Sequence, residues 1–354
     1  MSYVTIPMHA SHQDDLLRLW KENLTGLEHS DDLHARSTWA YQQKPDGAAR
    51  TIVVADEASG ALIGCGSAYP RVVSLNGARL VAGVLADFAV SRTHRSGAAA
   101  LLIQRALATG GAEPPLSFLY GLPNEAALPI FKRIGYKALG AVQAWVKPLH
   151  AAYKLREYMT RGSFAQFAAV PVDSYLAAAD ARRMRRFPTS KSFIVQRADH
   201  RFDDLWHRGR WSYALAGQRT ASYLNWRYTA PTASAREFYC LCEQGHTELL
   251  GYIAFSRHDN KVLVEDVFAV DLGESAERLL LRFTCEMRDR GCDSAYVSYF
   301  GDSRFARCLS RSGFVHRGEQ ERTVMLMTRG VTSDQAKALG TPNSWFLFSG
   351  EMDV

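Results

Sequence analysis

The sequence has few of the features that mark membrane, secreted or metal-binding proteins. No apolar run approaches the roughly 18 residues that a membrane-spanning helix needs. The first residues lack the basic segment and apolar core of a signal peptide. The six cysteines form no C-x-x-C pair, and no histidine cluster accompanies them. We therefore expect a cytoplasmic protein with free thiols, no membrane insertion and no metal site.

Charge of one sign is only slightly in excess. Lysine and arginine number 42 against 36 aspartates and glutamates, which gives a formal net charge of +6. This excess favours anionic partners such as a nucleotide cofactor. Nucleic acid would need a denser basic stripe than the short run Arg182, Arg183, Arg185 and Arg186. That run is typical of a solvated helix face or a linker, so we expect no nucleic-acid partner.

The 354 residues are long for one domain and sufficient for two. Hydrophobic periodicity predicts the same order of elements twice. In the first half we expect strands at 51–56, 62–71, 80–90, 116–120, 136–141 and 145–148, with helices near 98–106 and 127–134. In the second half we expect strands at 237–243, 249–256, 261–270 and 295–299, with helices near 276–287 and 305–309.

Short matching segments support a duplication. Phe88-Ala89-Val90 corresponds to Phe268-Ala269-Val270, and Gly135-Tyr136 to Gly313-Phe314. Coincidence could explain one match, but the shared order of elements favours duplication. We therefore predict a first domain at 1–150, a linker at 151–189 and a second domain at 190–330. The tail, 331–354, is predicted to pack its apolar residues on the second domain.

One turn in the first half suits a phosphate group. After a strand, the tiny residues Ser96 to Ala100 open a helix, and Arg95 precedes them. Backbone N–H groups at a helix start bind anions when no bulky side chain blocks the approach. A small-residue helix packed tightly on a sheet is the alternative interpretation.

This turn and a later segment together resemble the GNAT (Gcn5-related) acetyltransferases. The family writes the turn as R-x-x-G-x-G/A and follows a later strand with N-x-x-A-x-x-x-Y-x-x-x-G-F. The second pattern is matched by Asn124, Ala127, Phe131, Gly135 and Tyr136, and the first by Arg95, Ala98 and Ala100.

The resemblance implies an α/β (α+β) fold class with two tandem GNAT-like folds. Each fold would be a mixed, mostly antiparallel sheet flanked by helices. It also implies acetyl-CoA or another acyl-CoA as co-substrate. The residues implied in binding it are Phe88, Ala89, Val90, Arg95, Ser96, Gly97, Ala98, Ala99, Ala100, Asn124, Ala127 and Phe131.

Two positions depart from the family pattern. Most members have glycine where Ala98 stands; an alanine there is strained if the position needs a positive φ and harmless if it is helical. Phe131 replaces a tyrosine that is thought to protonate the CoA thiolate, which phenylalanine cannot do. Asp87 is the carboxylate in the place of the family's general base. Its alternative role is that of a strand-end residue that faces solvent or caps a turn.

The second half lacks the phosphate turn. Asp271, Glu274 and Glu277 stand where phosphate would arrive, so we expect no CoA there. This half is either a decayed copy kept for packing or a wall of the acceptor site. Segments 202–206 and 223–228 resemble GNAT-like proteins associated with bacterial polysaccharide synthesis. That likeness predicts acceptor contacts at Trp226, Arg227 and Tyr228; burial in the core is the alternative.

We therefore predict an acyltransferase that moves an acetyl or other short acyl group from CoA to an amine. The acceptor would be a small molecule such as an amino sugar or its nucleotide-linked form. Two other functions remain open. One is a non-catalytic module that senses acyl-CoA, and the other is a Fem-type aminoacyl transferase.

Overall fold

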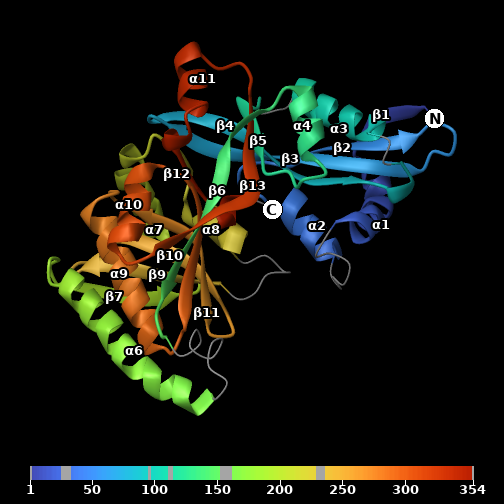
Figure 1. Ribbon diagram of the computed structural model, residues 1–354. Helices are drawn as coiled ribbons and strands as arrows, with labels where there is room; N and C mark the ends of the chain where they lie inside the picture. Colours follow the sequence, from blue (N-terminus) through green and yellow to red (C-terminus); the bar gives the residue numbers. More distant parts are fainter. Residues whose placement is uncertain are drawn as a thin grey trace.

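A single sheet runs through both halves of the molecule (Figure 1). The computed structural model describes residues 2–24, 33–94, 97–110, 115–151, 162–228 and 236–352. The strands within these ranges join into one 14-stranded sheet, in the order β1-β2-β3-β4-β5-β13-β6-β12-β11-β10-β9-β7. The small strands β8 and β14 pair with each other and connect β3 to β12.

The strands are β1 (Tyr3–Pro7), β2 (Arg50–Asp56), β3 (Leu62–Leu75), β4 (Ala78–Val90), β5 (Phe118–Gly121), β6 (Lys137–Pro148), β7 (Ser190–Val195), β8 (Leu215–Gly217), β9 (Arg236–Glu243), β10 (Leu249–His258), β11 (Lys261–Ala269), β12 (Ser294–Gly301), β13 (Val315–Thr328) and β14 (Trp345–Phe348). The helices are α1 (Gln13–Asn23), α2 (Leu33–Tyr41), α3 (Ala98–Thr109), α4 (Leu128–Ile134), α6 (Gly162–Met184), α7 (His200–Gly209), α8 (Ala221–Tyr228), α9 (Glu274–Asp289), α10 (Ser303–Arg311) and α11 (Ser333–Leu339).

The two halves exchange strands. β13 comes late in the chain, yet it lies between β5 and β6 of the first half. β6 in turn pairs with β12 of the second half. The predicted break between strands 136–141 and 145–148 is wrong, because β6 is one strand. It pairs with β13 on one edge and β12 on the other, and Val142 in the expected break is fully buried.

Helices cover both faces of the sheet. In the first half α3 and α4 lie on one face, and α1 and α2 lie on the opposite face (Figure 1). Within the predicted linker, residues 162–184 form helix α6, which packs against α9. An ion pair fixes this contact, since Asp180 lies 2.6 Å from the guanidinium of Arg288.

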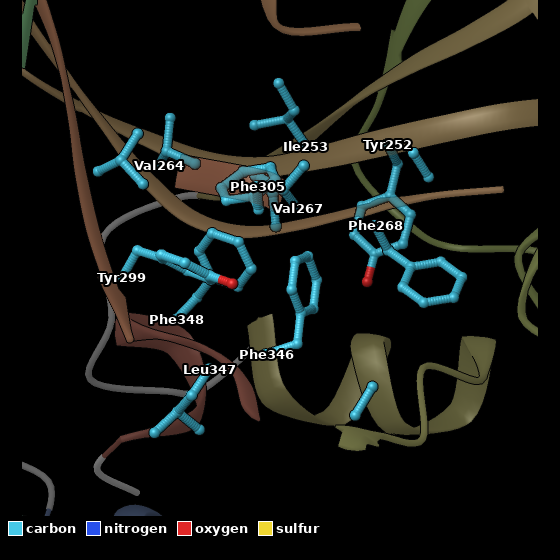
Figure 2. Packing of buried hydrophobic residues seen from close by; sticks show 14 of the residues in the cluster. Tyr252, Ile253, Val264, Val267, Phe268, Tyr299, Phe305, Phe346, Leu347 and Phe348 are labelled. Atoms are coloured by element: carbon cyan, nitrogen blue, oxygen red, sulfur yellow. The ribbon is translucent and has the colours of Figure 1, made fainter. Parts of the chain in front are cut away.

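The tail inserts its apolar residues between the halves. Phe346 and Phe348 pack around Phe305 and Tyr299 of the second half, with ring centroids 4.9 to 5.7 Å apart (Figure 2). Trp345 points to the first half, where its ring lies 5.3 Å from that of Tyr120. The tail therefore packs on the second half and contacts the first as well.

The hairpin between β3 and β4 is closed by Asn76 and Gly77, both with positive φ (48° and 83°). These dihedrals match the type I′ turn, whose twist suits antiparallel strands. The ring of Trp211, from the second half, covers this turn so closely that a Cβ on Gly77 would overlap it. Trp211 itself is 64% exposed. The hairpin tip therefore docks onto an aromatic side chain from the other half.

We predict that Gly77→Ala destabilises the protein through both φ strain and overlap with Trp211. Strain alone costs about 1–2 kcal/mol, and overpacking adds about 1–3 kcal/mol. Gly245→Ala is the matched control, because Gly245 has φ +81° and open space around it. Urea unfolding should show the larger loss for Gly77→Ala, and Trp211→Ala should remove the difference. Equal losses in both glycine variants would show that Trp211 does not restrain the turn.

Candidate functional site

The parallel strands β4 and β5 are paired only along the first half of β4 and diverge after Val84. Their register pairs Ala82 with Phe118, Gly83 with Leu119 and Val84 with Tyr120. β4 continues to Val90 and stays paired with β3, but in the described ranges it forms no further pairs with β5. The edge of β4 from Leu85 to Val90 therefore carries backbone groups that no neighbouring strand uses. In this stretch Ala89 is buried, whereas Phe88 and Val90 are half-buried.

Helix α3 begins just beyond the end of β4. Gly97 caps it with φ +87°, and a Cβ there would have nothing within 4 Å. Ala98 is the first helical residue and has no positive φ, so alanine in place of the family's glycine is not strained. Ala98 is exposed, while Ala99 and Ala100 are buried against the sheet. Arg95 and Ser96 lie outside the described residues.

The N–H groups of the first helical turn have no acceptor within a helix. Here they follow an open glycine turn, and no described side chain caps them. The helix dipole adds positive potential at the same place. This helix start can therefore hold a phosphate group.

Phe131 lies where β4 and β5 separate. A Cβ on Gly121 of β5 would be 3.5 Å from its ring, and the ring centroid of Phe88 on β4 is 6.2 Å away. Phe131 is buried, with Tyr136 packed against it at 4.9 Å. Asn124 accepts a hydrogen bond from the N–H of Ala127 (3.0 Å) and so caps the turn that leads into α4. Of the residues in the second motif, Phe131 therefore lies at the point of divergence, and it offers no hydroxyl there.

Asp87 occupies a β-bulge in β4. Cys65 faces Ala89 and Ser67 faces Ala86, so β4 carries one extra residue, and Asp87 has φ +52°. The alternative that Asp87 faces solvent is wrong, because it is only 8% exposed. The bulge turns its side chain toward α2.

Three donors surround the Asp87 carboxylate. Arg36 donates at 2.8 Å, Tyr41 donates at 3.0 Å, and Tyr69 donates a third, short hydrogen bond. Burial, and then the charge of Asp87, raise the pKa of both tyrosines, so they remain donors. The catalytic role of Asp87 stays a prediction; as a base it would have to accept a proton through these hydroxyls.

A chain of hydroxyls links Asp87 to a cavity of about 410 Å³ between α1, α2 and β2. Tyr41 lies 2.9 Å from the hydroxyl of Ser67, which lies 2.9 Å from that of Thr51. Tyr41 and Thr51 both line the cavity, together with His9 and Gln13. The carboxylate is therefore connected to a polar space although it does not reach it.

The second half contains the same chemical group. Asp266 lies beside a bulge in β11, where Ala254 faces Asp266 and Phe255 faces Val264. Its carboxylate accepts hydrogen bonds from Arg219 (2.9 Å) and from the hydroxyl of Tyr252 (2.6 Å). Both halves thus place an aspartate, an arginine and a tyrosine at a bulge, which indicates that the group braces the bend of the strand.

A tryptophan pair joins the halves. The indoles of Trp39 (α2) and Trp226 (α8) stack with centroids 4.8 Å apart and 14° between planes. Each indole N–H donates to the backbone carbonyl of the other residue, at 2.7 and 2.9 Å. The contact is not among those predicted from the sequence, although the spacing W-x-Y occurs in both helices, at Trp39/Tyr41 and Trp226/Tyr228.

The predicted acceptor residues lie at this junction. Trp226 and Tyr228 are buried, as the core alternative for them expected. Arg227 donates to the carbonyl of Gly350 and so holds the end of the chain. A contact of these three residues with an acceptor stays a prediction.

Buried charges also tie the halves together. Arg71 and Arg219 are each 1% exposed. The guanidinium of Arg71 pairs with Oε1 of Glu351 at 2.9 Å, and that of Arg219 pairs with Oε2 at 2.7 Å. Lys44 lies in the same interface, 3.9 Å from Asp46. Burial lowers the pKa of Lys44 to about 7, although the charge of Asp46 opposes this. Removal of one partner would leave an uncompensated buried charge.

In the second half, a carboxylate of the preceding segment caps the N-terminus of helix α9. Asp271 accepts hydrogen bonds from the N–H groups of Gly273 (2.7 Å) and Ser275 (3.4 Å), where α9 begins. Glu277 on the first turn is buried and pairs with Arg186 at 2.7 Å. Asp271 therefore takes the place that a phosphate takes at an open helix start.

All six cysteines are free, and five of them are buried. Among the described residues no group of three or more histidine, cysteine or acidic side chains could hold a metal ion. No helix in the ranges that the structure describes is long and apolar enough to cross a bilayer.

No family model and no curated protein sequence matches this chain. Solved structures do match it. A GCN5-related N-acetyltransferase from Anabaena variabilis aligns with a TM-score of 0.63 at 12% identity, over 92% of this chain and 73% of that one. The chain has the GNAT fold. The predicted mixed sheet flanked by helices is confirmed.

Two other solved structures give the same result. A probable N-acyltransferase from Enterococcus faecalis aligns with a TM-score of 0.63 at 10% identity, over 93% of this chain and 73% of that one. N-myristoyltransferase from Saccharomyces cerevisiae, with bound myristoyl-CoA, gives 0.54 at 12% identity, over 100% and 85%. At these identities the likeness concerns the fold.

We predict that Asp87→Asn and Asp266→Asn both destabilise the protein, Asp266→Asn the less. Each variant removes a buried carboxylate that pairs with an arginine, which costs up to about 3–5 kcal/mol, but Arg219 keeps its ion pair with Glu351 (2.7 Å) in Asp266→Asn. Chemical unfolding at neutral pH measures both losses, and Asp56→Asn at the end of β2 is the control. If Asp87→Asn kept full stability while Asp266→Asn lost it, the two aspartates would not be equivalent braces.

Proposed function

We propose that this chain is a cytoplasmic acyltransferase that takes a short acyl group, such as acetyl, from CoA and passes it to an amine. The observation that carries the proposal is the parting of β4 and β5 beside the open start of α3. Such an arrangement offers unpaired strand backbone to an extended ligand and helix N–H groups to its phosphates. The GNAT fold, shared with structures described as acetyl- and acyltransferases, supports it.

The chain's own residues would share the work. Gly97 and the first turn of α3 would hold the pyrophosphate, with Arg95 as an added charge. A backbone N–H between Phe88 and Val90 would donate to the developing oxyanion. The free base form of the amine is the nucleophile, and its proton would pass to Asp87 through the hydroxyl groups around it.

The acceptor is proposed to be a small amine, such as an amino sugar or its nucleotide-linked form. We propose further that the chain is a tandem of two GNAT-like units, in which the second supplies a wall of the acceptor site. The shared Asp–Arg–Tyr group and the paired tryptophans support a duplication. The looser likeness to polysaccharide-associated proteins favours a sugar acceptor.

One rival function has a specific observation in its favour. Phe131 offers no proton to the leaving thiolate, and its ring is buried where β4 and β5 diverge. A module that only senses acyl-CoA would need no acid there. The Fem-type alternative, which uses charged tRNA, has no comparable support among the described residues.

We predict that Ala98→Glu abolishes acetyl-CoA binding but leaves the fold intact. A carboxylate at the first position of α3 stabilises a helix start, yet it repels a pyrophosphate there. Ala98→Lys, a long side chain of opposite charge, should bind at least as tightly as the parent. Calorimetry on the full chain measures both, together with thermal unfolding. Parent-like binding by Ala98→Glu would place the cofactor elsewhere.

We predict that Phe131→Tyr raises kcat and leaves the KM for acetyl-CoA unchanged. A well-placed general acid contributes roughly 10²–10⁴-fold, and a grafted hydroxyl should give a smaller gain. A thiol reagent reports free CoA during a screen of amino sugars and other small amines. An unchanged kcat in a folded variant would mean that water or another group protonates the thiolate. Absence of turnover by the parent on every amine would favour the sensor.

A further inference from the structure

A groove rich in arginine lies on the second half, away from the proposed acyl-CoA site. It has a volume of about 530 Å³ and lies between the end of α6 and the end of α10. Its lining residues are Ala179, Arg182, Arg183, Arg186, Ser310 and Arg311. The run Arg182–Arg186 is typical of a solvated helix face or a linker, but the fold brings a fourth arginine, from α10, to meet three of its members.

The carboxylates of this region are already shared among several cations. Asp180 pairs with Lys147 (2.9 Å), Arg183 (3.0 Å) and Arg288 (2.6 Å). A single carboxylate cannot neutralise three cations, so this side of the groove keeps an excess of positive charge.

The other side is arranged in the same way. Glu277 pairs with Arg186 (2.7 Å) and lies 4.0 Å from Arg311. Arg182 forms no ion pair with any described carboxylate within 4.0 Å. Like charges that line one groove repel each other, and an anion between them would relieve the repulsion.

Burial separates the two signs of charge. The side chains of Asp180 and Glu277 are 1% and 7% exposed, whereas those of Arg186 and Arg311 are 55% and 67% exposed. The acids thus form a floor that orients the arginines, and the guanidinium groups form the rim. An oriented guanidinium presents its remaining N–H groups as a fork that suits phosphate oxygens.

We propose that this groove is a second ligand site, which binds the diphosphate group of a small soluble molecule such as a nucleotide. Its volume lies within the range of small-molecule sites. Four arginines around one groove match an anion with several charges better than a single carboxylate. The site is independent of the acyl-CoA site, since α3 and the groove lie in different halves of the chain (Figure 1).

The test is a calorimetric titration of the full chain carrying Ala98→Glu with inorganic pyrophosphate and with ADP, at constant ionic strength. Ala98→Glu removes the proposed phosphate site of the first half, so pyrophosphate reports on the groove. CoA is left out, because its own diphosphate would compete for the groove. The variant Arg182→Gln/Arg311→Gln removes two rim charges and keeps the floor. Arg185→Gln is the matched control, because Arg185 is exposed in the turn directly after α6 but does not line the groove. Thermal unfolding confirms that each variant is folded.

We expect one saturable pyrophosphate site, weakened at least about tenfold in the double variant and by less than about twofold in Arg185→Gln. If both variants bound pyrophosphate equally weakly, the arginines would act only through the overall positive electrostatic potential of the protein, and the proposal would be overturned. Absence of saturable binding would also overturn it. The proposal would also be overturned if a single-stranded oligonucleotide bound through these arginines while pyrophosphate and ADP did not bind.

The outcome is separable from the proposed acyl transfer. If CoA does not bind, pyrophosphate binding that depends on Arg182 and Arg311 still supports the groove. If CoA binds and pyrophosphate does not, the groove proposal fails and the acyltransferase proposal stands.

Discussion

The exchange of β6 and β13 between the halves is the constraint on which the rest of the structure depends. β13 completes the sheet of the first half, and β6 completes that of the second. Neither half can therefore satisfy its backbone hydrogen bonds without the other, because an unpaired buried strand edge is costly. The short β5, which borders the parting from β4, has β13 as its other neighbour. The proposed cofactor site thus depends on a strand that comes 200 residues later in the chain.

Side chains reinforce the same junction. Trp39 and Trp226 hold α2 against α8, and Glu351 joins Arg71 to Arg219. These contacts are buried, so their indole N–H groups and charged groups lose hydration. Only complete hydrogen bonding and ion pairing offset that cost. The result is a rigid junction next to α2, whose Tyr41 also bonds to Asp87. Packing between the halves and the shape of the candidate site are therefore coupled.

The two halves have similar strands, but the N-termini of their helices α3 and α9 differ in whether a carboxylate caps them. α3 begins at an open glycine turn, whereas the N–H groups at the start of α9 are capped by Asp271. The bulge with its aspartate and arginine is present in both. This combination is what one expects if the bulge shapes the strand and the helix start binds the ligand. In the second half, arginines near the ends of α6 and α10 pair with Glu277 on the first turn of α9.

The sequence by itself determined most of what is local. Hydrophobic periodicity gave most of the strands, Asn76-Gly77 marked the hairpin, and the motif around Asn124 and Phe131 indicated the fold. These signals depend on a residue and its near neighbours, as helix and turn formation do. Tertiary structure decided the strand exchange, the partners of Asp87 and the arginine groove. Arg36 and Trp226 meet their partners across 51 and 187 residues, and backbone pairing between distant strands leaves no mark in the sequence of either one.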